Sequence, residues 1–120
     1  MAGGIGFGIE ESAHRLGHLR WTSQRLFALL GGWVTAIPEP DVKLWVATVS
    51  RHHGWHAELL EERLPRVGDL AADRVTRPAD PAAARWFDEV DAAFGPDTTA
   101  ERLTVVCRIV VPHVASVVRW

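Results

Sequence analysis

The sequence predicts an all-α protein folded as a four-helix bundle, and three observations lead to this prediction. Apolar residues recur every three or four positions in four segments of the 120-residue chain. Capping residues, prolines or glycines mark the ends of these segments. The composition, 48% hydrophobic and 23% charged, is typical of a globular protein. We therefore expect a single helical domain over residues 1–120, the commonest size for one core.

The first two helices are predicted to be long. The first spans residues 10–30, with leucines on one side and the glycine pair 31–32 as its end. The segment 38–40, Pro-Glu-Pro, forms a turn. Asp41 is then expected to cap the second helix, which continues to Leu64 and ends before a proline. The preceding residues 1–8, rich in glycine, are expected to form a flexible arm.

The second half of the chain predicts a long loop and two shorter helices. The loop covers residues 66–79, which are polar and include glycine and proline. Asp80 and Pro81 are typical of a helix start, and Gly95 ends that helix. Thr98 and Glu101 have the spacing of a capping box and open the fourth helix. Its many β-branched residues would also suit a strand, but the cap and the spacing favour a helix, kinked at Pro112.

Charge and cysteine content argue against several classes of partner. The formal net charge is −2, so the chain lacks the basic surface that binds nucleic acid. No uncharged apolar run reaches the ~20 residues needed to span a bilayer, so we expect no membrane partner. The single cysteine, Cys107, excludes an internal disulfide, and the opening residues do not resemble a secretory signal. These features predict a cytoplasmic protein.

Three histidines lie close together on the second predicted helix. At about 100° per residue, His52, His53 and His56 fall within about 60° of the centre of the apolar side. Buried imidazoles need hydrogen-bond partners, a metal or a ligand, because an unsatisfied buried polar group costs about 1–3 kcal/mol. The cluster is therefore the first candidate for a functional site.

Two interpretations of this cluster stay open. His52 and His56 are one turn apart and have the spacing of two metal ligands, with His113 as a third, for Fe, Zn or Cu. Alternatively, the histidines form a core hydrogen-bond network without a metal. His53, Trp45 and Trp55 are the candidates for contact with a small ligand, and an imidazole can also serve as a general acid or base.

The first helix carries a second face with mixed character. His14, His18, Trp21, Arg25 and Leu29 lie opposite its leucine stripe. Because tryptophan and arginine are enriched at protein interfaces, this face is predicted to join two copies in a homodimer. Two solvent-facing histidines are the alternative interpretation for His14 and His18.

Four short motifs follow one another along the chain: Leu-Leu-Gly-Gly-Trp-Val at 29–34, Pro38-x-Pro40, Gly-Trp-His-Ala-Glu-Leu-Leu at 54–60, and Leu64-Pro65. In this order they resemble motifs of bacterial ferritin-like four-helix-bundle proteins. The resemblance implies a ferritin-like architecture. Ferritin-like carboxylate proteins hold two metals with inward glutamates and paired Glu-x-x-His motifs. We find no such pair and expect the dimetal site to be absent or rebuilt around histidine.

The resulting functional expectation is a non-catalytic or accessory protein that acts through binding or self-assembly. The alternative is a small metal-dependent oxidoreductase or oxygenase-like enzyme that uses His52 and His56. The sequence leaves open whether the chain is an enzyme and whether a small molecule or a protein is its partner.

Overall fold

The structure is a computed structural model that describes residues 8–95, 98–112 and 115. Within these ranges every regular element is helical, so the predicted all-α class is confirmed. The elements in order are α1 (Ile9–Val34), α2 (Pro40–Glu62), α3 (Ala72–Val75), α4 (Pro81–Ala93), α5 (Thr99–Val105) and the π-helix η1 (Val106–Val110). Of the predicted N-terminal arm, residues 1–7 lie outside the described residues, as does His113.

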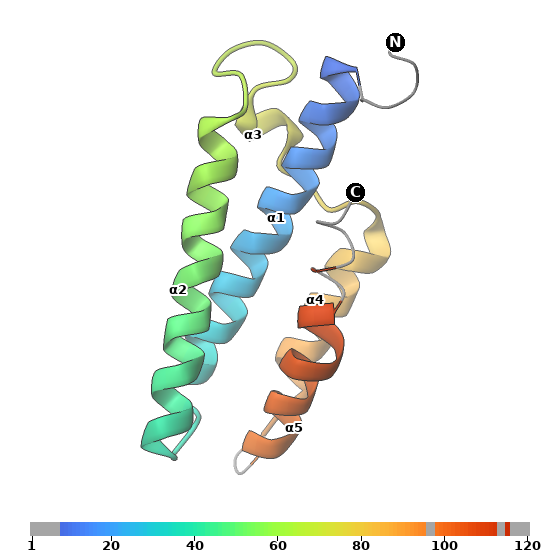
Figure 1. Cartoon of the computed structure of the whole chain (residues 1–120). Coiled ribbons are helices and arrows are strands. Elements are labelled where there is room, and N and C mark those ends of the chain that lie inside the picture. The colour runs from blue at the N-terminus through green and yellow to red at the C-terminus, as the bar shows by residue number, and fades with distance from the viewer. Residues whose placement is uncertain (1–7, 96–97, 113–114, 116–120) are drawn as a thin grey trace.

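The long helices α1 and α2 run antiparallel, side by side, while α4 and α5 lie beyond α1 on its other side (Figure 1). α1 packs against α2, α3 and α4, whereas α2 packs extensively only against α1 in the described part of the chain. α2 therefore forms one edge of the molecule. Its outer side carries no other described helix, and this arrangement decides where the candidate site lies.

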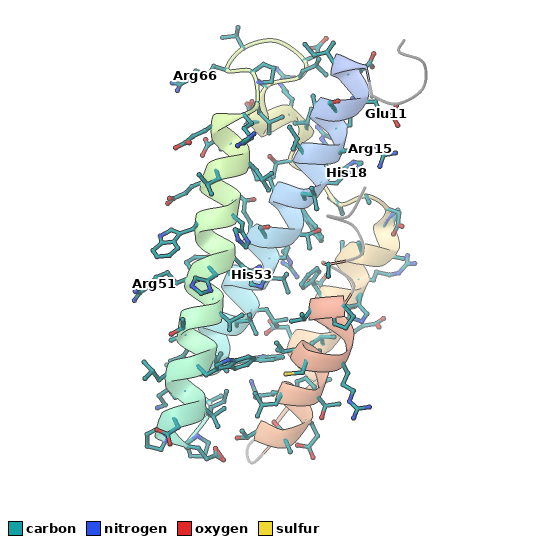
Figure 2. The ribbon with its side chains drawn as sticks, viewed as in Figure 1. Glu11, Arg15, His18, Arg51, His53 and Arg66 are labelled. Carbon is teal, nitrogen blue, oxygen red and sulfur yellow. The ribbon has the colours of Figure 1, made fainter. Side chains whose placement is uncertain are left out.

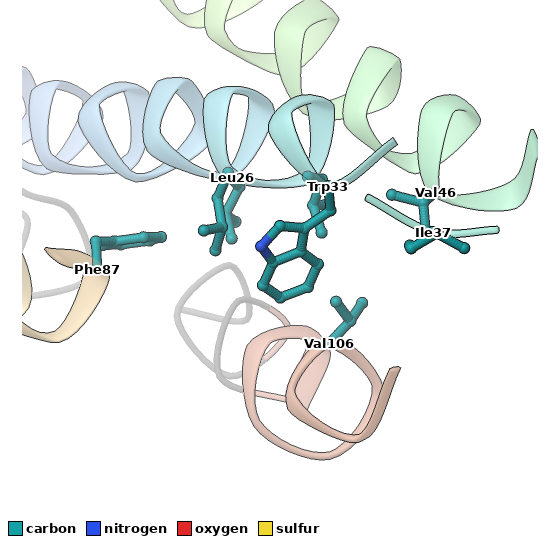
Figure 3. Close-up of a cluster of buried hydrophobic side chains, with 8 residues drawn as sticks. Leu26, Trp33, Ile37, Val46, Phe87 and Val106 are labelled. Atoms are coloured by element: carbon teal, nitrogen blue, oxygen red, sulfur yellow. The ribbon is translucent and has the colours of Figure 1, made fainter. Parts of the chain in front are cut away.

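The main core lies where α1 meets the other helices. It contains the buried residues Leu26, Leu29, Leu30, Trp33, Ile37, Val46, Phe87 and Val106. Figure 3 shows Leu26 and Trp33 of α1 reaching towards Phe87 of α4 and Val106 of η1. Burying side chains of this size contributes about 1.5–3 kcal/mol each. The α1 leucine stripe is thus the centre of the fold.

A smaller core holds α3 against the first half of α1. Ala13, Leu64 and Val75 are buried together there. Gly17 makes this contact possible, since a Cβ at that position would lie 2.0 Å from the carbonyl oxygen of Val75. The predicted loop 66–79 therefore contains one helical turn, α3, whose backbone packs directly on α1.

The end of α1 differs from the prediction. The helix continues through the glycine pair 31–32 to Val34. A glycine in a helix costs about 1 kcal/mol relative to alanine. Trp33 offsets this cost, because its indole is buried against Phe94 at a ring distance of 5.6 Å and beneath the Arg102 guanidinium at 5.2 Å.

Of the caps predicted for the two shorter helices, one is confirmed and the other is wrong. The Asp80 cap of α4 is confirmed, since its Oδ1 accepts a hydrogen bond from the Ala83 amide at 2.9 Å. The capping box of α5 is wrong: Thr98 makes no cap bond. Its hydroxyl donates to the Gly95 carbonyl at 2.7 Å and accepts from Arg102 Nε at 3.0 Å instead. Beyond α5 the helix widens to the π-helix η1, just before Pro112, where a kink was expected.

Candidate functional site

Only one of the three clustered histidines of α2 faces the core. His53 is buried, with 8% of its surface exposed, whereas His52 and His56 are exposed. The prediction that all three point inward is therefore wrong for His52 and His56. Their proposed metal-binding role stays a prediction, now for a surface position.

Small residues explain why the buried face of α2 was misplaced. The buried residues of α2 are Val46, Ser50, His53 and Ala57, so two of the four are small. The Ser50 hydroxyl donates a hydrogen bond to the Phe27 carbonyl at 2.9 Å, and a Cβ at Gly31 would lie 3.3 Å from that hydroxyl. Close packing of two helices favours such small side chains. The hydrophobic pattern instead gave weight to Trp45, which is 41% exposed.

His53 is held as a neutral imidazole. Burial, followed by repulsion from His56 and His52, lowers the pKa of His53 from 6.5 to about 4. Its Nδ1 is buried and has no hydrogen-bond partner among the described residues. The ring lies edge-on to that of His56 at a centroid distance of 5.9 Å. His53 is thus a buried residue with a ring nitrogen unpaired within the described part of the chain, beneath the surface histidines.

The outer side of α2 carries the largest cluster of exposed apolar and aromatic side chains on any described helix. Leu44 is 69% exposed, and Trp55 and Leu59 are each 53% exposed. With Trp45, His52 and His56 they occupy an arc of about 120° around the helix, away from α1. We call these six residues the outer stripe: Leu44, Trp45, His52, Trp55, His56 and Leu59.

Opposite charges lie at the two ends of the same arc. Asp41, in the first turn of α2, is exposed, as is Arg63 at the C-terminal cap. At about 100° per residue both fall within the arc of the outer stripe. The stripe therefore has Asp41 at one end and the neighbouring Glu62 and Arg63 at the other, with the polar Thr48 between its two pairs of large apolar residues.

The two exposed histidines occupy the middle of the outer stripe. The His52 ring lies beside Trp55 at a centroid distance of 5.7 Å. In a helix, residues four apart have Cβ atoms only about 5–6 Å apart, so both imidazoles can reach one ion. No group of three or more His, Cys, Asp or Glu side chains suited to a metal occurs in the part of the chain that the structure describes. One chain therefore offers two ligands at this position.

A shallow groove borders the outer stripe on the α1 side. Its volume is about 390 Å³, and Phe27 of α1 and Trp55 of α2 form apolar walls. Arg20 and Arg51 bring positive charge and Glu61 negative charge to its lining. Figure 2 shows Arg51 projecting outward from α2. Phe27 itself is 50% exposed, so the groove extends the apolar surface of the stripe.

The face of α1 that was predicted to join two copies is covered within the chain. Trp21 packs edge-on against Phe87 of α4 at 5.5 Å, and Leu29 is buried in the main core. Arg25 pairs with Asp88 of α4 at 2.9 Å. The prediction of an exposed interface at Trp21, Arg25 and Leu29 is wrong, because periodicity reveals a second apolar face but not which helix covers it.

His14 and His18 lie at the edge of that face. His14 is exposed and His18 half-buried, with their rings 6.5 Å apart. A single Glu-x-x-His spacing does occur in the chain, at Glu11 and His14. Both are exposed in the first turns of α1, and Glu11 pairs with Arg15 at 3.1 Å. This spacing occurs once in the chain, so the paired dimetal pattern is still lacking.

Sequence reasoning missed Leu44 and Leu59 as surface residues. A partial signal was present: Trp45, His52 and Leu59 repeat every seven residues with Thr48 and Trp55 between them, which is the spacing of a helix seam with three of its five positions apolar. This seam lies on the opposite side from the small residues that contact α1.

No helix among the described residues is long and apolar enough to cross a bilayer. Comparisons with protein-family models, with curated proteins and with solved structures found no match to the chain.

Proposed function

We propose that this protein is a non-catalytic helical protein that self-associates through the outer stripe of α2. The observation that carries the proposal is the row of exposed Trp45, Trp55 and Leu59 on a helix that no other described helix covers on that side. Contiguous exposed apolar surface of this kind marks interaction sites in soluble proteins. The occupant that fits best is a second copy of the same chain.

The size of the stripe suits a small dimer interface. A half-exposed aromatic or leucine side chain presents on the order of 100 Å², so the six residues present on the order of 600 Å². A standard interface buries about 800 Å² per partner, and weaker, transient ones bury less. We therefore expect a reversible dimer with a dissociation constant in the micromolar range, about 1–100 µM.

Charge favours an antiparallel arrangement of the two α2 helices. A two-fold axis across the middle of the stripe brings the Asp41 end of one copy beside the Arg63 end of the other. Parallel helices would place like charges together, which is unfavourable. In this arrangement Asp41 of each copy faces Arg63 of the other, with Glu62 beside each Arg63.

Sedimentation equilibrium of the untagged chain tests the proposal. Between about 1 and 200 µM, wild type is expected to pass from monomer to dimer. Leu59→Glu places a charge within the stripe and should leave a monomer. Val67→Glu is the matched control, since Val67 is 83% exposed but lies in the loop after α2.

Each outcome decides a separate point. A dimer for wild type and Val67→Glu, together with a monomeric Leu59→Glu, supports the proposal. A wild-type monomer throughout the range overturns it. Equal dimerisation of all three proteins overturns the choice of surface.

We also propose the more specific features that the sequence led us to expect. α1, α2, α4 and the α5–η1 segment are the four members of the ferritin-like bundle we infer, in a cytoplasmic bacterial protein. The alternative, a metal-dependent oxidoreductase using His52 and His56, ranks second, since the described residues form no group of three or more metal-ligating side chains. An oxygenase-like site needs further ligands from another element.

A further inference from the structure

We propose that a transition-metal ion, with Zn²⁺ as the best fit, binds between two copies of this chain through His52 and His56 of each copy. This inference rests on the proposed self-association through the outer stripe. It assigns a ligand to the middle of that interface, where two chains together complete a site that one chain leaves incomplete.

The ligand set within one chain is half of a tetrahedral site. His52 and His56 are exposed on the same face and four residues apart, the spacing with which one helix supplies two imidazoles to zinc. The His52 ring contacts the ring of Trp55, and the His56 ring contacts the ring of His53. Both side chains can therefore turn towards a common ion by changing rotamers at the surface.

A second copy supplies the missing ligands. The midpoint of His52 and His56 lies close to the middle of the outer stripe, which runs from Leu44 to Leu59. A two-fold axis through this midpoint places the histidine pair of one copy opposite the pair of the other. Four imidazole nitrogens at about 2.0–2.1 Å then give the tetrahedral coordination that Zn²⁺ prefers.

The flanking side chains fit the spacing that such a site requires. Packed helices have axes about 8–10 Å apart, and an ion held by imidazoles from both sides needs the wide end of this range or slightly more. Trp45 and Trp55 are the bulkiest side chains of the stripe and can fill this wider gap on both sides of the ion. Their apolar rings would also shield the ion from water.

The test uses the metal itself as the probe. Untagged protein is stripped of metal, and its dimerisation is measured by sedimentation equilibrium in EDTA and again with added ZnCl₂. For wild type we expect Zn²⁺ to tighten dimerisation at least tenfold, with one ion bound for every two chains. Co²⁺ in place of Zn²⁺ should give the intense visible absorption of a tetrahedral nitrogen site.

Matched variants locate the site. His52→Ala and His56→Ala should each abolish the effect of Zn²⁺ and the Co²⁺ absorption, and as exposed residues their loss should not unfold the protein. His14→Ala is the control, because His14 and His18 form the other pair with this spacing, on α1. It should respond to Zn²⁺ like wild type.

The outcomes separate this inference from the proposed function. A dimer that Leu59→Glu abolishes but that Zn²⁺ leaves unchanged overturns the metal site and supports self-association. A monomer with and without Zn²⁺ overturns both. Zinc binding that His14→Ala removes and His52→Ala leaves intact places the ion on α1 and overturns the proposed site.

Discussion

His53 makes the stability of this protein depend on pH. The pKa of His53 falls from 6.5 to about 4 on folding, so the folded protein disfavours the charged imidazole. Its contribution to stability is complete above pH 6.5 and is lost as the pH falls towards 4. This difference corresponds to about 3 kcal/mol, which partial contact with solvent reduces to about 2 kcal/mol.

The replacement His53→Leu removes this titration while filling a similar volume. It also removes the buried Nδ1 that has no partner among the described residues, so we expect equal or higher stability at pH 7.5. Urea unfolding of both proteins at several pH values between 7.5 and 4.5 measures the effect. Wild type should lose about 2 kcal/mol more than the variant over this range. All other histidines are common to both, so parallel stability curves would refute the assignment of this titration to His53.

Five further variants test the packing and the proposed interface. Gly17→Ala should destabilise the fold by about 1–3 kcal/mol, because the new methyl group meets the α3 backbone. Gly32→Ala, whose methyl group meets nothing within 4 Å, should stabilise α1 by up to about 1 kcal/mol. Thermal unfolding compares the stabilities of the two variants. Asp41→Arg alone should weaken dimerisation, and the double exchange Asp41→Arg with Arg63→Asp should restore it. Antiparallel pairing would be contradicted if sedimentation showed that the double variant dimerises no more tightly than the single variant. Trp21→Glu should lower the urea midpoint without affecting dimerisation, because Trp21 packs against α4; a monomeric but fully stable variant would return the interface to α1.

The helical elements were predictable where the signals are local. Asp80 followed by proline specified the start of α4, because the cap bond forms between residues three apart. The end of α1 was not predictable in this way. Trp33 continues the helix past two glycines through contacts with Phe94 and Arg102, which lie 61 and 69 residues further along the sequence.

The candidate site was predictable in its residues but not in its orientation. The sequence singled out His52, His56, Trp45 and Trp55, and the structure places all four on the outer stripe, not at the core. A hydrophobic pattern assumes that large apolar residues face the core. The buried side of α2 instead combines Val46 and His53 with the small Ser50 and Ala57, and the tryptophans stay outside.

The outer stripe of α2 is proposed to join two copies of the chain. Tryptophan indole N–H signals in a ¹H–¹⁵N spectrum test this most directly, because each one reports on its own surface. On dilution from a dimeric to a monomeric concentration, the signals of Trp45 and Trp55, assigned by single Trp→Phe replacements, are predicted to shift. Trp21 and Trp33 pack within the chain, so their signals should stay in place. Unchanged Trp45 and Trp55 signals, or shifts confined to Trp21, would contradict the claim.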